Sequence, residues 1–398
     1  MEIQEINGRK NAPFSHACLR SPDASFKVLG MQKHQAKTPA FEFFGTRKRR
    51  VRIIDQRYLP HRLVVQELKC FDDAVASIRD MQVRGAPLIG VTAAAGMYLA
   101  SQEAPLKAAA FDAFMQKAAR RLKAARPTAV NLAWAADLQL KTLGSAGQAA
   151  EKKARLLQAA RLIAAEDEAC CRQIGEHGLA LIKKIARRKK NKPVQIMTHC
   201  NAGRLAAVAW GTATAPVYAA QAAGIPIHVW VSETRPRNQG ASLTAWELGE
   251  AGVPYTLVVD NACGHILQEG LVDLVIVGCD RMARNGDAAN KIGTYLKALA
   301  ARAHRVPFYV ALPSSTVDWT LPSGVGKIPI EDRGSREVVA MTGRCGKNKI
   351  QEIRLAPGKA AAKNPGFDVT PAALISGIIT ERGICRPSQI KKIFKDRL

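Results

Sequence analysis

The sequence predicts an α/β protein: a mainly helical N-terminal domain with a small sheet, followed by a Rossmann-like domain with a doubly wound parallel sheet. Helical periodicity dominates from residue 71 to about residue 186. After Asn191-Lys192-Pro193 the pattern changes to short apolar runs that alternate with loops and helical sequence. The chain has 398 residues, 47% of them hydrophobic, which suffices for two cores. We therefore expect domains at 41–190 and 191–388.

The N-terminal part should begin with strands and continue as helices. Residues 1–40 show little periodicity, and we expect a loosely ordered extension there. Apolar stretches at 51–55 and 63–65 predict short strands. Alanine-rich stretches at 107–110 and 148–150 favour helices, because alanine has the highest helix propensity.

Five short apolar runs predict the strands of the second domain. They lie at 194–199, 227–232, 255–259, 274–278 and 308–312. Because helical sequence separates most of them, the strands are expected to run parallel. The domain lacks the G-x-G-x-x-G fingerprint, so the sequence does not indicate a dinucleotide. A stretch at 356–365 that contains proline and glycine predicts a loop.

Two of these strands end in a reactive side chain. Cys200 follows the strand at 194–199, and Asp280 follows the strand at 274–278. Ligands of open α/β sheets bind outside the carboxyl ends of the strands, so the thiol and the carboxylate should share one crevice. We expect a nearby helix start to lower the pKa of the Cys200 thiol and to leave its sulfur exposed. The apolar strand should raise the pKa of Asp280, which then keeps a proton to donate.

Plainer structural roles are open for the same residues. Cys200 would then be a buried structural thiol, and Asp280 a helix cap or an ion-pair partner of Arg281. Alternation along the strand turns His199 away from Cys200, which favours a core or supporting role for the histidine. Cys279 is expected to serve packing.

Three segments show the pattern of an anion site, in which a cation lies beside a helix start. These segments are Arg84-Gly85-Ala86-Pro87, Arg126-Pro127-Thr128 and Asn290-Lys291. Free backbone amides at a helix start and a nearby cation together bind phosphate. Each segment alone is more typical of a capped helix with a solvated cation, but three in one chain favour a phosphorylated ligand.

A polar loop at 232–240 follows the strand at 227–232 and precedes helical sequence from Ala241. Gln239 is its best donor and acceptor for a ligand hydroxyl. A surface turn held by Pro236 and Gly240 explains the loop equally well.

The composition restricts partners and compartment. The net charge of +26 and the pI of about 10.0 suggest nucleic acid, but no aromatic-rich or helix-turn-helix pattern accompanies them, so nucleic-acid binding is not favoured. The nine cysteines form no C-x-x-C pair, so neither a disulfide framework nor a metal site is expected. No apolar stretch approaches the ~20 residues that span a bilayer. The first residues lack a secretory signal, and a cytoplasmic location is the default expectation.

Together the motifs resemble those of the 5-methylthioribose-1-phosphate isomerases, from about residue 45 to 385. The matching segments are Arg84-Gly85-Ala86-Pro87, Arg126-Pro127-Thr128-Ala129-Val130-Asn131-Leu132, Thr198-His199-Cys200-Asn201-Ala202-Gly203, Glu233-Thr234-Arg235-Pro236 with Gln239-Gly240, Asp280-Arg281 through to Asn290-Lys291-Ile292-Gly293-Thr294-Tyr295, and Asn364-Pro365-Gly366-Phe367-Asp368-Val369-Thr370-Pro371. The superfamily also includes the regulatory subunits of translation initiation factor 2B and the ribose-1,5-bisphosphate isomerases.

The resemblance implies an aldose-to-ketose isomerisation in methionine salvage, carried out by a homodimer without metal or cofactor, with 191–388 as the catalytic domain. Asp280 matches the family's proton donor, and Cys200 matches the residue at the C1–C2 hydrogen shift. Whether that hydrogen moves as a proton or as a hydride stays open. The residues at substrate-binding positions are Arg84, Gly85, Ala86, Arg126, Gln239, Asn290 and Lys291.

The chain departs from the family pattern in four places, and two alternative functions follow. The departures are the long extension before residue 40, Cys279 and Leu88 where small residues are usual, and an atypical insertion at 345–363. The substrate could instead be another 1-phosphorylated pentose, such as 5-deoxyribose 1-phosphate or ribose 1,5-bisphosphate. A non-catalytic regulatory subunit is the alternative of another class, and only the +26 charge supports it.

Overall fold

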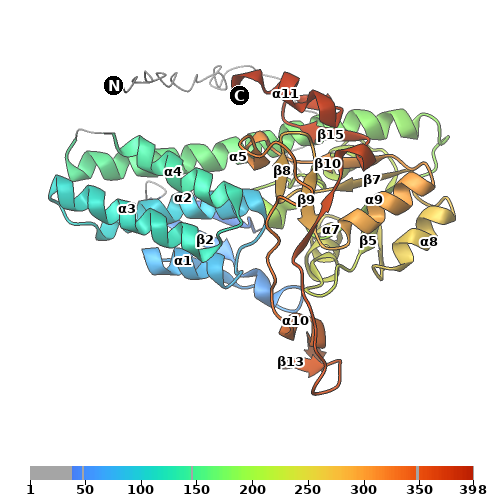
Figure 1. Ribbon diagram of the computed structural model, residues 1–398, viewed down its shortest axis with the longest axis horizontal. Helices are drawn as coiled ribbons and strands as arrows, with labels where there is room; N and C mark the ends of the chain where they lie inside the picture. Colours follow the sequence, from blue (N-terminus) through green and yellow to red (C-terminus); the bar gives the residue numbers. More distant parts are fainter. Residues whose placement is uncertain (1–37, 47–48, 145–146, 347–348, 398) are drawn as a thin grey trace, which may run out of the picture.

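The computed structural model describes residues 38–46, 49–144, 147–346 and 349–397, so almost all of the predicted extension at 1–40 lies outside the described residues. The described chain forms a helical region and a sheet region that lie side by side (Figure 1). The α/β architecture predicted from the alternation of elements is confirmed. None of the described helices is both long and apolar enough to cross a membrane.

The helical region begins with a three-stranded antiparallel sheet in the order β1-β2-β3. Its strands are β1 (Phe41–Phe44), β2 (Arg50–Ile54) and β3 (Val65–Leu68). The strand predicted at 51–55 is confirmed, the one predicted at 63–65 begins two residues later, and β1 was missed because its sequence adjoins the extension. The helices that follow are α1 (Phe71–Arg79), α2 (Ala86–Glu103), α3 (Ala108–Ala125), α4 (Val130–Leu143) and α5 (Ala149–Ala186).

Two helices explain how the regions are joined. Helix α2 is buried from Ala86 to Ser101 because the other helices surround it, and this accounts for its apolar sequence on every side. Helix α5 has 38 residues and is therefore roughly 57 Å long. Its first half packs in the helical core through residues such as Leu156, whereas Ile174 and Ile182 in its second half pack against the large sheet.

The large sheet has seven strands in the order β16-β15-β10-β7-β4-β5-β6. They are β4 (Val194–Thr198), β5 (Ile227–Ser232), β6 (Tyr255–Val258), β7 (Leu274–Val277), β10 (Phe308–Ala311), β15 (Gly377–Thr380) and β16 (Gly383–Cys385). Six of them pair in parallel, and only β16 runs antiparallel to its neighbour. The five predicted strands are confirmed to within one residue, whereas β15 and β16 were not predicted.

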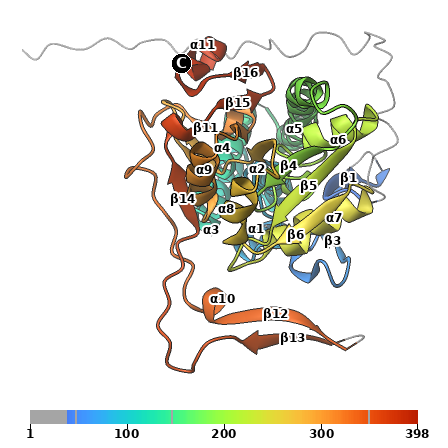
Figure 2. The same ribbon diagram turned by 90° about the vertical axis from the view of Figure 1, so that its right-hand side faces the viewer.

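Helices cover both faces of this sheet (Figure 2). Along β4, Ile196 faces the core shared with α5 and α6 (Ala215–Ala222), and Met197 faces the core shared with α8 (Ala262–Gln268) and α9 (Thr294–Ala303). This alternation buries both faces of the strand, which explains its continuous apolar sequence.

The strand order reverses between β4 and β7. From β4 the chain proceeds outward to β5 and β6, and it then returns to place β7 on the other side of β4. In doubly wound sheets such a switch point leaves a gap at the carboxyl ends of the two central strands. Cys200 and Asp280 follow these two strands.

A second, four-stranded sheet was not predicted. It has the order β11-β8-β9-β14 and consists of β8 (Arg281–Ala283), β9 (Ala288–Lys291), β11 (Val317–Asp318) and β14 (Phe367–Thr370). The sequence does not indicate this sheet, because its strands are short and irregularly spaced. It begins immediately after Asp280, at the carboxyl end of β7.

A hairpin projects from the body of the molecule (Figure 2). It consists of β12 (Ala340–Cys345) and β13 (Lys349–Arg354), preceded by the short helix α10 (Arg336–Val339). The segment described above as an atypical insertion at 345–363 therefore includes one of its strands. The loop predicted at 356–365 is confirmed, since it holds only an isolated bridge at Pro365.

Candidate active site

Cys200 adopts a left-handed backbone conformation at the end of β4. Its φ angle is 63°, which costs a residue with a side chain roughly 1–2 kcal/mol. Two threonines hold this conformation: the Cys200 amide donates to Thr234 Oγ1 at 2.8 Å, and Thr244 Oγ1 donates to the Cys200 carbonyl at 2.6 Å. Backbone strain held in place by its surroundings is typical of functional positions.

Asp280 lies at the end of the neighbouring strand. Its amide donates to the Ala289 carbonyl at 2.9 Å, so the second sheet fixes its backbone. Both plainer roles considered for it are wrong, because Arg281 pairs with Asp318 instead and a strand rather than a helix follows. The carboxyl group is therefore left for another partner.

Arg84 reaches from the helical region to Cys200. Its Nη1 donates to Asn201 Oδ1 at 2.6 Å, and its Nη2 donates to the Asn201 carbonyl at 2.6 Å and lies 3.8 Å from Cys200 Sγ. Gly85 follows with a φ of 87°, and a Cβ there would lie 2.5 Å from the Cβ of Ala206. Only glycine allows this close approach, which places the predicted start of α2 at Ala86, beside the Cys200 loop.

Lys291 and Asn290 lie on β9, one strand of the second sheet. The Lys291 Nζ donates to the Gly366 carbonyl at 2.8 Å and sits 4.5 Å from the centre of the Phe367 ring. Asn290 Nδ2 donates to Thr294 Oγ1 at 3.0 Å, at the first residue of α9. The helix start predicted after these residues is confirmed.

Arg126 precedes α4, as predicted, and approaches the site from the helical region. Its side chain is 10% exposed, and its Nη2 lies 3.6 Å from Glu331 Oε2. Its buried Nε has no hydrogen-bond partner among the described residues. A buried donor without a partner costs about 1–3 kcal/mol, so this nitrogen is suited to a ligand oxygen.

Gln239 shows the same lack of a partner. It is 3% exposed, and its Oε1 accepts no hydrogen bond from the described part of the chain. The loop that carries it is packed tightly, because a Cβ on Gly240 would lie 1.7 Å from the Ser232 carbonyl oxygen. The predicted helix follows as a π-helical turn (Gly240–Thr244) and then α7 (Ala245–Glu250).

Comparison with known proteins agrees with this arrangement. The model of the initiation factor 2 subunit family matches residues 82–387. A relative from Desulfosudis oleivorans named methylthioribose-1-phosphate isomerase is 54% identical over 338 residues, which are 85% of this chain and 91% of the relative. The chain belongs to this isomerase family.

Solved structures agree as well. The crystal structure of 5-methylthioribose 1-phosphate isomerase from Pyrococcus horikoshii has a TM-score of 0.78 and 38% identity, and the match covers 92% of this chain and 98% of that one. The structure titled translation initiation factor eIF-2B, subunit delta, from A. fulgidus has a TM-score of 0.74 and 35% identity over 90% of this chain and 100% of that one. Both branches of the superfamily therefore share this fold.

The expected raised pKa of Asp280 is confirmed. Burial raises it, while the charges of Lys291, Arg84 and Arg126 oppose the shift and Glu331 adds to it. The electrostatic effects of these three cations on the Asp280 pKa place its carboxyl group near three separate segments of the chain. In this family member the helical region and the two sheets thus meet at Asp280.

The expected low pKa of Cys200 is wrong. Burial raises the pKa of this thiol, and the nearby cations Arg84 and Lys291 lower it less. No α-helix begins directly after Cys200: a 3-10 turn (Arg204–Ala206) follows, and α6 starts only at Ala215. The expected exposure is also wrong, since the residue is only 5% exposed. The thiol therefore stays protonated near neutral pH.

His199 and Cys279 have the supporting roles that were predicted. His199 Nε2 donates to the Ile292 carbonyl at 2.8 Å, and burial lowers its pKa to about 3, so the ring is neutral. Cys279 Sγ lies 3.5 Å from the Ala289 carbonyl and packs beside β9. Neither side chain is available as a catalytic base.

Several residues around the site were not predicted. They include Glu331 and Arg333, whose side chains pair at 2.8 Å beside Arg126, and the buried pair Asn201 and Glu247, which are joined at 2.8 Å. Asn201 belongs to the matched motif, which is a usable signal. The other three gave none, because they lie far along the chain from the motif residues that they support.

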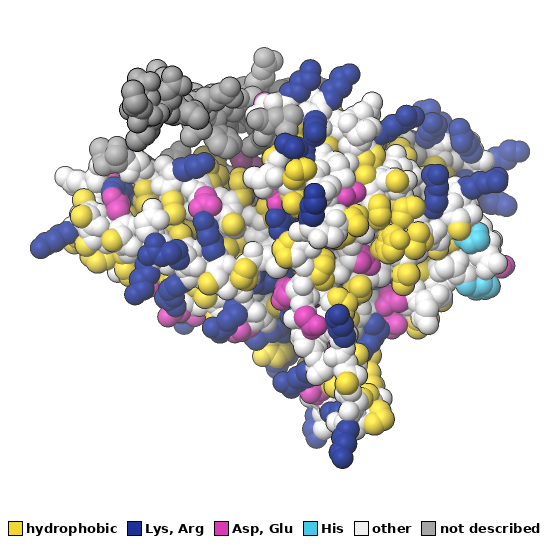
Figure 3. Space-filling view, viewed as in Figure 1, with side chains coloured by type: hydrophobic (Ala, Val, Ile, Leu, Met, Phe, Trp, Pro, Cys, Tyr) yellow, Lys and Arg dark blue, Asp and Glu magenta, His cyan; other side chains and the backbone are white. Residues whose placement is uncertain are grey.

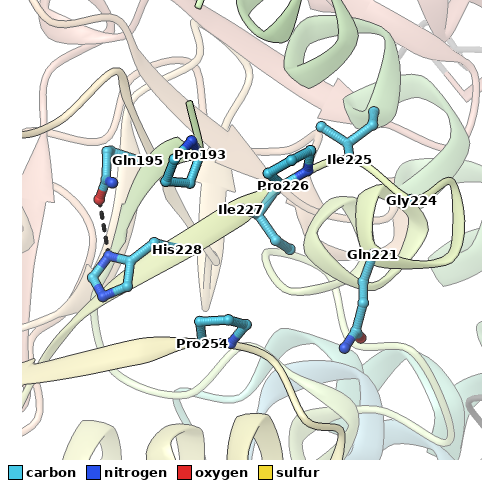
Figure 4. A pocket seen from close by; sticks show the side chains of 9 residues that line it. All are labelled: Pro193, Gln195, Gln221, Gly224, Ile225, Pro226, Ile227, His228 and Pro254. Carbon is cyan, nitrogen blue, oxygen red and sulfur yellow. Dashed lines mark hydrogen bonds between the residues drawn. The ribbon is translucent and has the colours of Figure 1, made fainter. Parts of the chain in front are cut away.

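A hollow of about 520 Å³ lies at the opposite end of the same strands (Figure 4). Three prolines line it, at the amino ends of β4, β5 and β6: Pro193, Pro226 and Pro254. It is distant from Cys200 and Asp280, because those residues follow the carboxyl ends of the strands. The hollow is therefore separate from the residues that gather at the carboxyl ends of the strands.

Proposed function

We propose that this chain converts 5-methylthioribose 1-phosphate to 5-methylthioribulose 1-phosphate in methionine salvage. The observation that carries the proposal is the placement of Cys200 and Asp280 after neighbouring strands at the switch point, with Arg84 and Lys291 beside both. Cations and the start of α2 suit the phosphate, and the unpartnered Gln239 Oε1 suits a sugar hydroxyl.

Asp280 is the acid that opens the sugar ring. Because the phosphate occupies the anomeric oxygen, the ring cannot open by loss of a proton from that oxygen. Protonated Asp280 gives its proton to the ring oxygen, which also takes the electron pair of the breaking bond to C1. Burial raises the pKa of Asp280 above its ordinary value, which favours the protonated form that an acid needs.

Cys200 lies where hydrogen moves from C2 to C1. The hydrogen adds to C1, the C2 hydroxyl loses its proton and C2 becomes a ketone. This proton replaces the one that Asp280 gave to the ring oxygen, so no atom or electron is gained or lost overall. Because burial keeps the Cys200 thiol protonated, it is a poor base for removing a proton from carbon. This favours direct hydride transfer in a buried site. Product formed in D2O should then contain no deuterium at C1, whereas proton transfer through solvent would introduce it.

The charges favour a substrate with one phosphate. The two carboxylates Glu331 and Glu337 offset two of the three positive charges with which they pair, on Arg126, Arg237 and Arg333. Arg84 and Lys291 are the predicted cations that donate to neutral oxygens, and they can serve a single anion. Ribose 1,5-bisphosphate would need a second set of this kind.

A direct activity assay tests the proposal. Purified protein is incubated with 5-methylthioribose 1-phosphate, 5-deoxyribose 1-phosphate and ribose 1,5-bisphosphate, and ketose formation is followed by NMR. The first compound should have the highest kcat/KM. Preference for the bisphosphate would contradict the substrate assignment, and lack of turnover with all three would favour the non-catalytic regulatory subunit.

We propose a homodimer on the basis of exposed apolar surface. Leu296 on α9 is 68% exposed, and Figure 3 shows apolar side chains gathered over this helix. The edge strand β6 also exposes Tyr255 and Leu257. Apolar surface and an open strand edge of this kind favour association. Light scattering should give twice the monomer mass, and Leu296→Glu should reduce it if α9 lies in the interface.

We also propose a cytoplasmic location. Seven of the described cysteines are free thiols, which fits a reducing compartment: Cys70, Cys171, Cys200, Cys263, Cys279, Cys345 and Cys385. Cell fractionation with detection of the native protein tests this, and recovery from the secreted fraction would contradict it.

A further inference from the structure

Glu247 on α7 is a fully buried carboxylate that the proposed chemistry does not use. It is 0% exposed. Its Oε1 accepts from Asn201 Nδ2 at 2.8 Å, and its Oε2 accepts from the Leu205 amide at 3.3 Å. Burial of a carboxylate is costly, and this one has no salt-bridge contact among the described residues. A position this costly requires an explanation.

Asn201 connects this carboxylate to Arg84. An arginine only donates, and an ionised carboxylate only accepts. The Asn201 amide satisfies both in a single orientation, with Oδ1 toward Arg84 and Nδ2 toward Glu247. Thr244 Oγ1 accepts from the same Nδ2 at 3.2 Å, but Glu247 is the nearer and the charged acceptor. Glu247 therefore strengthens the orientation in which the amide oxygen faces the guanidinium, and through it the direction of Arg84.

The backbone around Glu247 leaves little room for an alternative position. A Cβ on Gly203 would lie 1.5 Å from Glu247 Oε1, so the loop can approach the carboxylate only with glycine at this position. The charged and titratable groups that face Glu247 are Arg204 from the 3-10 turn, Arg84 and, on α6, Tyr218. Burial raises the pKa of Glu247 to about 7.

We propose that Glu247 is a positioning residue that aims Arg84 at the substrate phosphate through the Asn201 amide. It acts through Asn201 and Arg84 and does not touch the substrate. The assignment of the anion to Arg84 rests on the proposed function.

The test uses sulfate as the anion, because its charge is constant between pH 5 and 9 and its binding does not depend on which sugar is isomerised. Sulfate affinity of the full chain is measured by calorimetry at pH 8 for the native protein, Glu247→Gln and Glu250→Gln. Glu250 is the matched control, since it lies exposed at the end of the same helix. We expect about tenfold weaker sulfate binding for Glu247→Gln and no change for Glu250→Gln.

The direction of this effect separates positioning from simple electrostatics. Removing a negative charge near Arg84 would by itself tighten anion binding. Weaker binding therefore supports the proposal, and unchanged or tighter binding overturns it.

Combination with Arg84→Met gives a second readout. If Glu247 acts through Arg84, adding Glu247→Gln to Arg84→Met should cause no further loss of sulfate affinity. A merely structural role would reduce sulfate binding in both backgrounds.

If Glu247→Gln does not fold, Asn201→Ala breaks the same connection and should weaken sulfate binding similarly. Failure of both variants to fold would assign the network to stability and overturn the proposal. If the native protein binds sulfate but isomerises no sugar phosphate, only the proposed function fails.

Discussion

The two ends of the large sheet contain the same kinds of side chain in opposite conditions. At the amino ends, His228 Nδ1 donates to Gln195 Oε1 at 2.9 Å (Figure 4). Its Nε2 lies 2.9 Å from Thr256 Oγ1, so both ring nitrogens have a partner. At the carboxyl ends, Gln239 and Arg126 keep buried atoms without partners, and Cys200 holds a left-handed backbone. The histidine at the amino ends is satisfied by neighbouring side chains, although Gln221 in the same hollow keeps one buried oxygen without a partner among the described residues. At the carboxyl ends the unpartnered atoms lie beside the thiol and the carboxylate of the proposed chemistry, where a ligand can satisfy them.

This difference follows from topology. Parallel strands bring all their carboxyl ends to one edge, and the reversed strand order opens a gap there between β4 and β7. Substitutions at the two ends should therefore differ in kind. Substitutions at the carboxyl ends should reduce turnover more than stability. Substitutions at the amino ends should change turnover and stability only slightly.

The largest effect is expected for Asp280→Asn. The amide cannot give a proton to the ring oxygen, so kcat should fall by ~10² or more. Steady-state kinetics checks the rate and circular dichroism checks the fold. Near-native turnover in a folded variant would remove Asp280 from the chemistry.

Cys200→Ser should have the next largest effect, a decrease in kcat of about 10². The hydroxyl is smaller and more strongly hydrated than the thiol at the point where hydrogen moves. Cys263→Ser is the matched control, because this buried cysteine lies on α8 and outside the site. Equal losses in the two variants would indicate a packing effect only.

The pH dependence should separate binding from chemistry. Asp280 has a raised pKa and loses its proton as the pH rises through that value. Because only the protonated carboxyl can act as the acid, kcat should fall about tenfold per pH unit above this pKa. Lys291 has a lowered pKa because of burial, and its loss of charge should raise KM on the same alkaline side. A kcat that is constant up to pH 10 would contradict the acid role of Asp280.

Asp280→Asn should also make the protein more stable at neutral pH. A carboxyl whose pKa is raised by folding favours the folded state most below its ordinary pKa of 3.8, and this contribution is lost as pH rises through the folded value. The uncharged amide does not have this pH-dependent loss of stability, and each kcal/mol regained raises Tm by roughly 1 °C in a chain of 398 residues. Calorimetry at pH 3 and pH 8 should show the larger gain at pH 8. A lower Tm at pH 8 would mean that Asp280 is structural.

The smallest effect is expected for His228→Gln at the amino ends. Glutamine can donate to Gln195 and accept from Thr256, so kcat/KM should stay within about twofold and stability within ~1 kcal/mol. A tenfold loss of activity would contradict the comparison between the two ends, because it would give the hollow in Figure 4 a role in function.

Local patterns in the sequence were sufficient for much of the fold. The five predicted strands match the structure to within one residue, because their apolar runs are buried on both faces and are bounded by turns. The second sheet was missed because its strands have two to four residues, too few to show a period. The pairing of Arg281 with Asp318 was missed for a related reason, since 37 residues separate them.

The sequence by itself determined the order of elements, the family and the residue types at Cys200, Asp280 and Lys291. Only the tertiary structure decided their electrostatic state. The pKa of Cys200 was expected to be low from its place after a strand, but burial raises it. A pKa depends on solvent exclusion and on charges from distant segments, and neither is encoded in neighbouring residues. The link from Glu247 to Arg84 likewise exists only after folding, because α7, the Cys200 loop and the start of α2 meet in space and not in sequence.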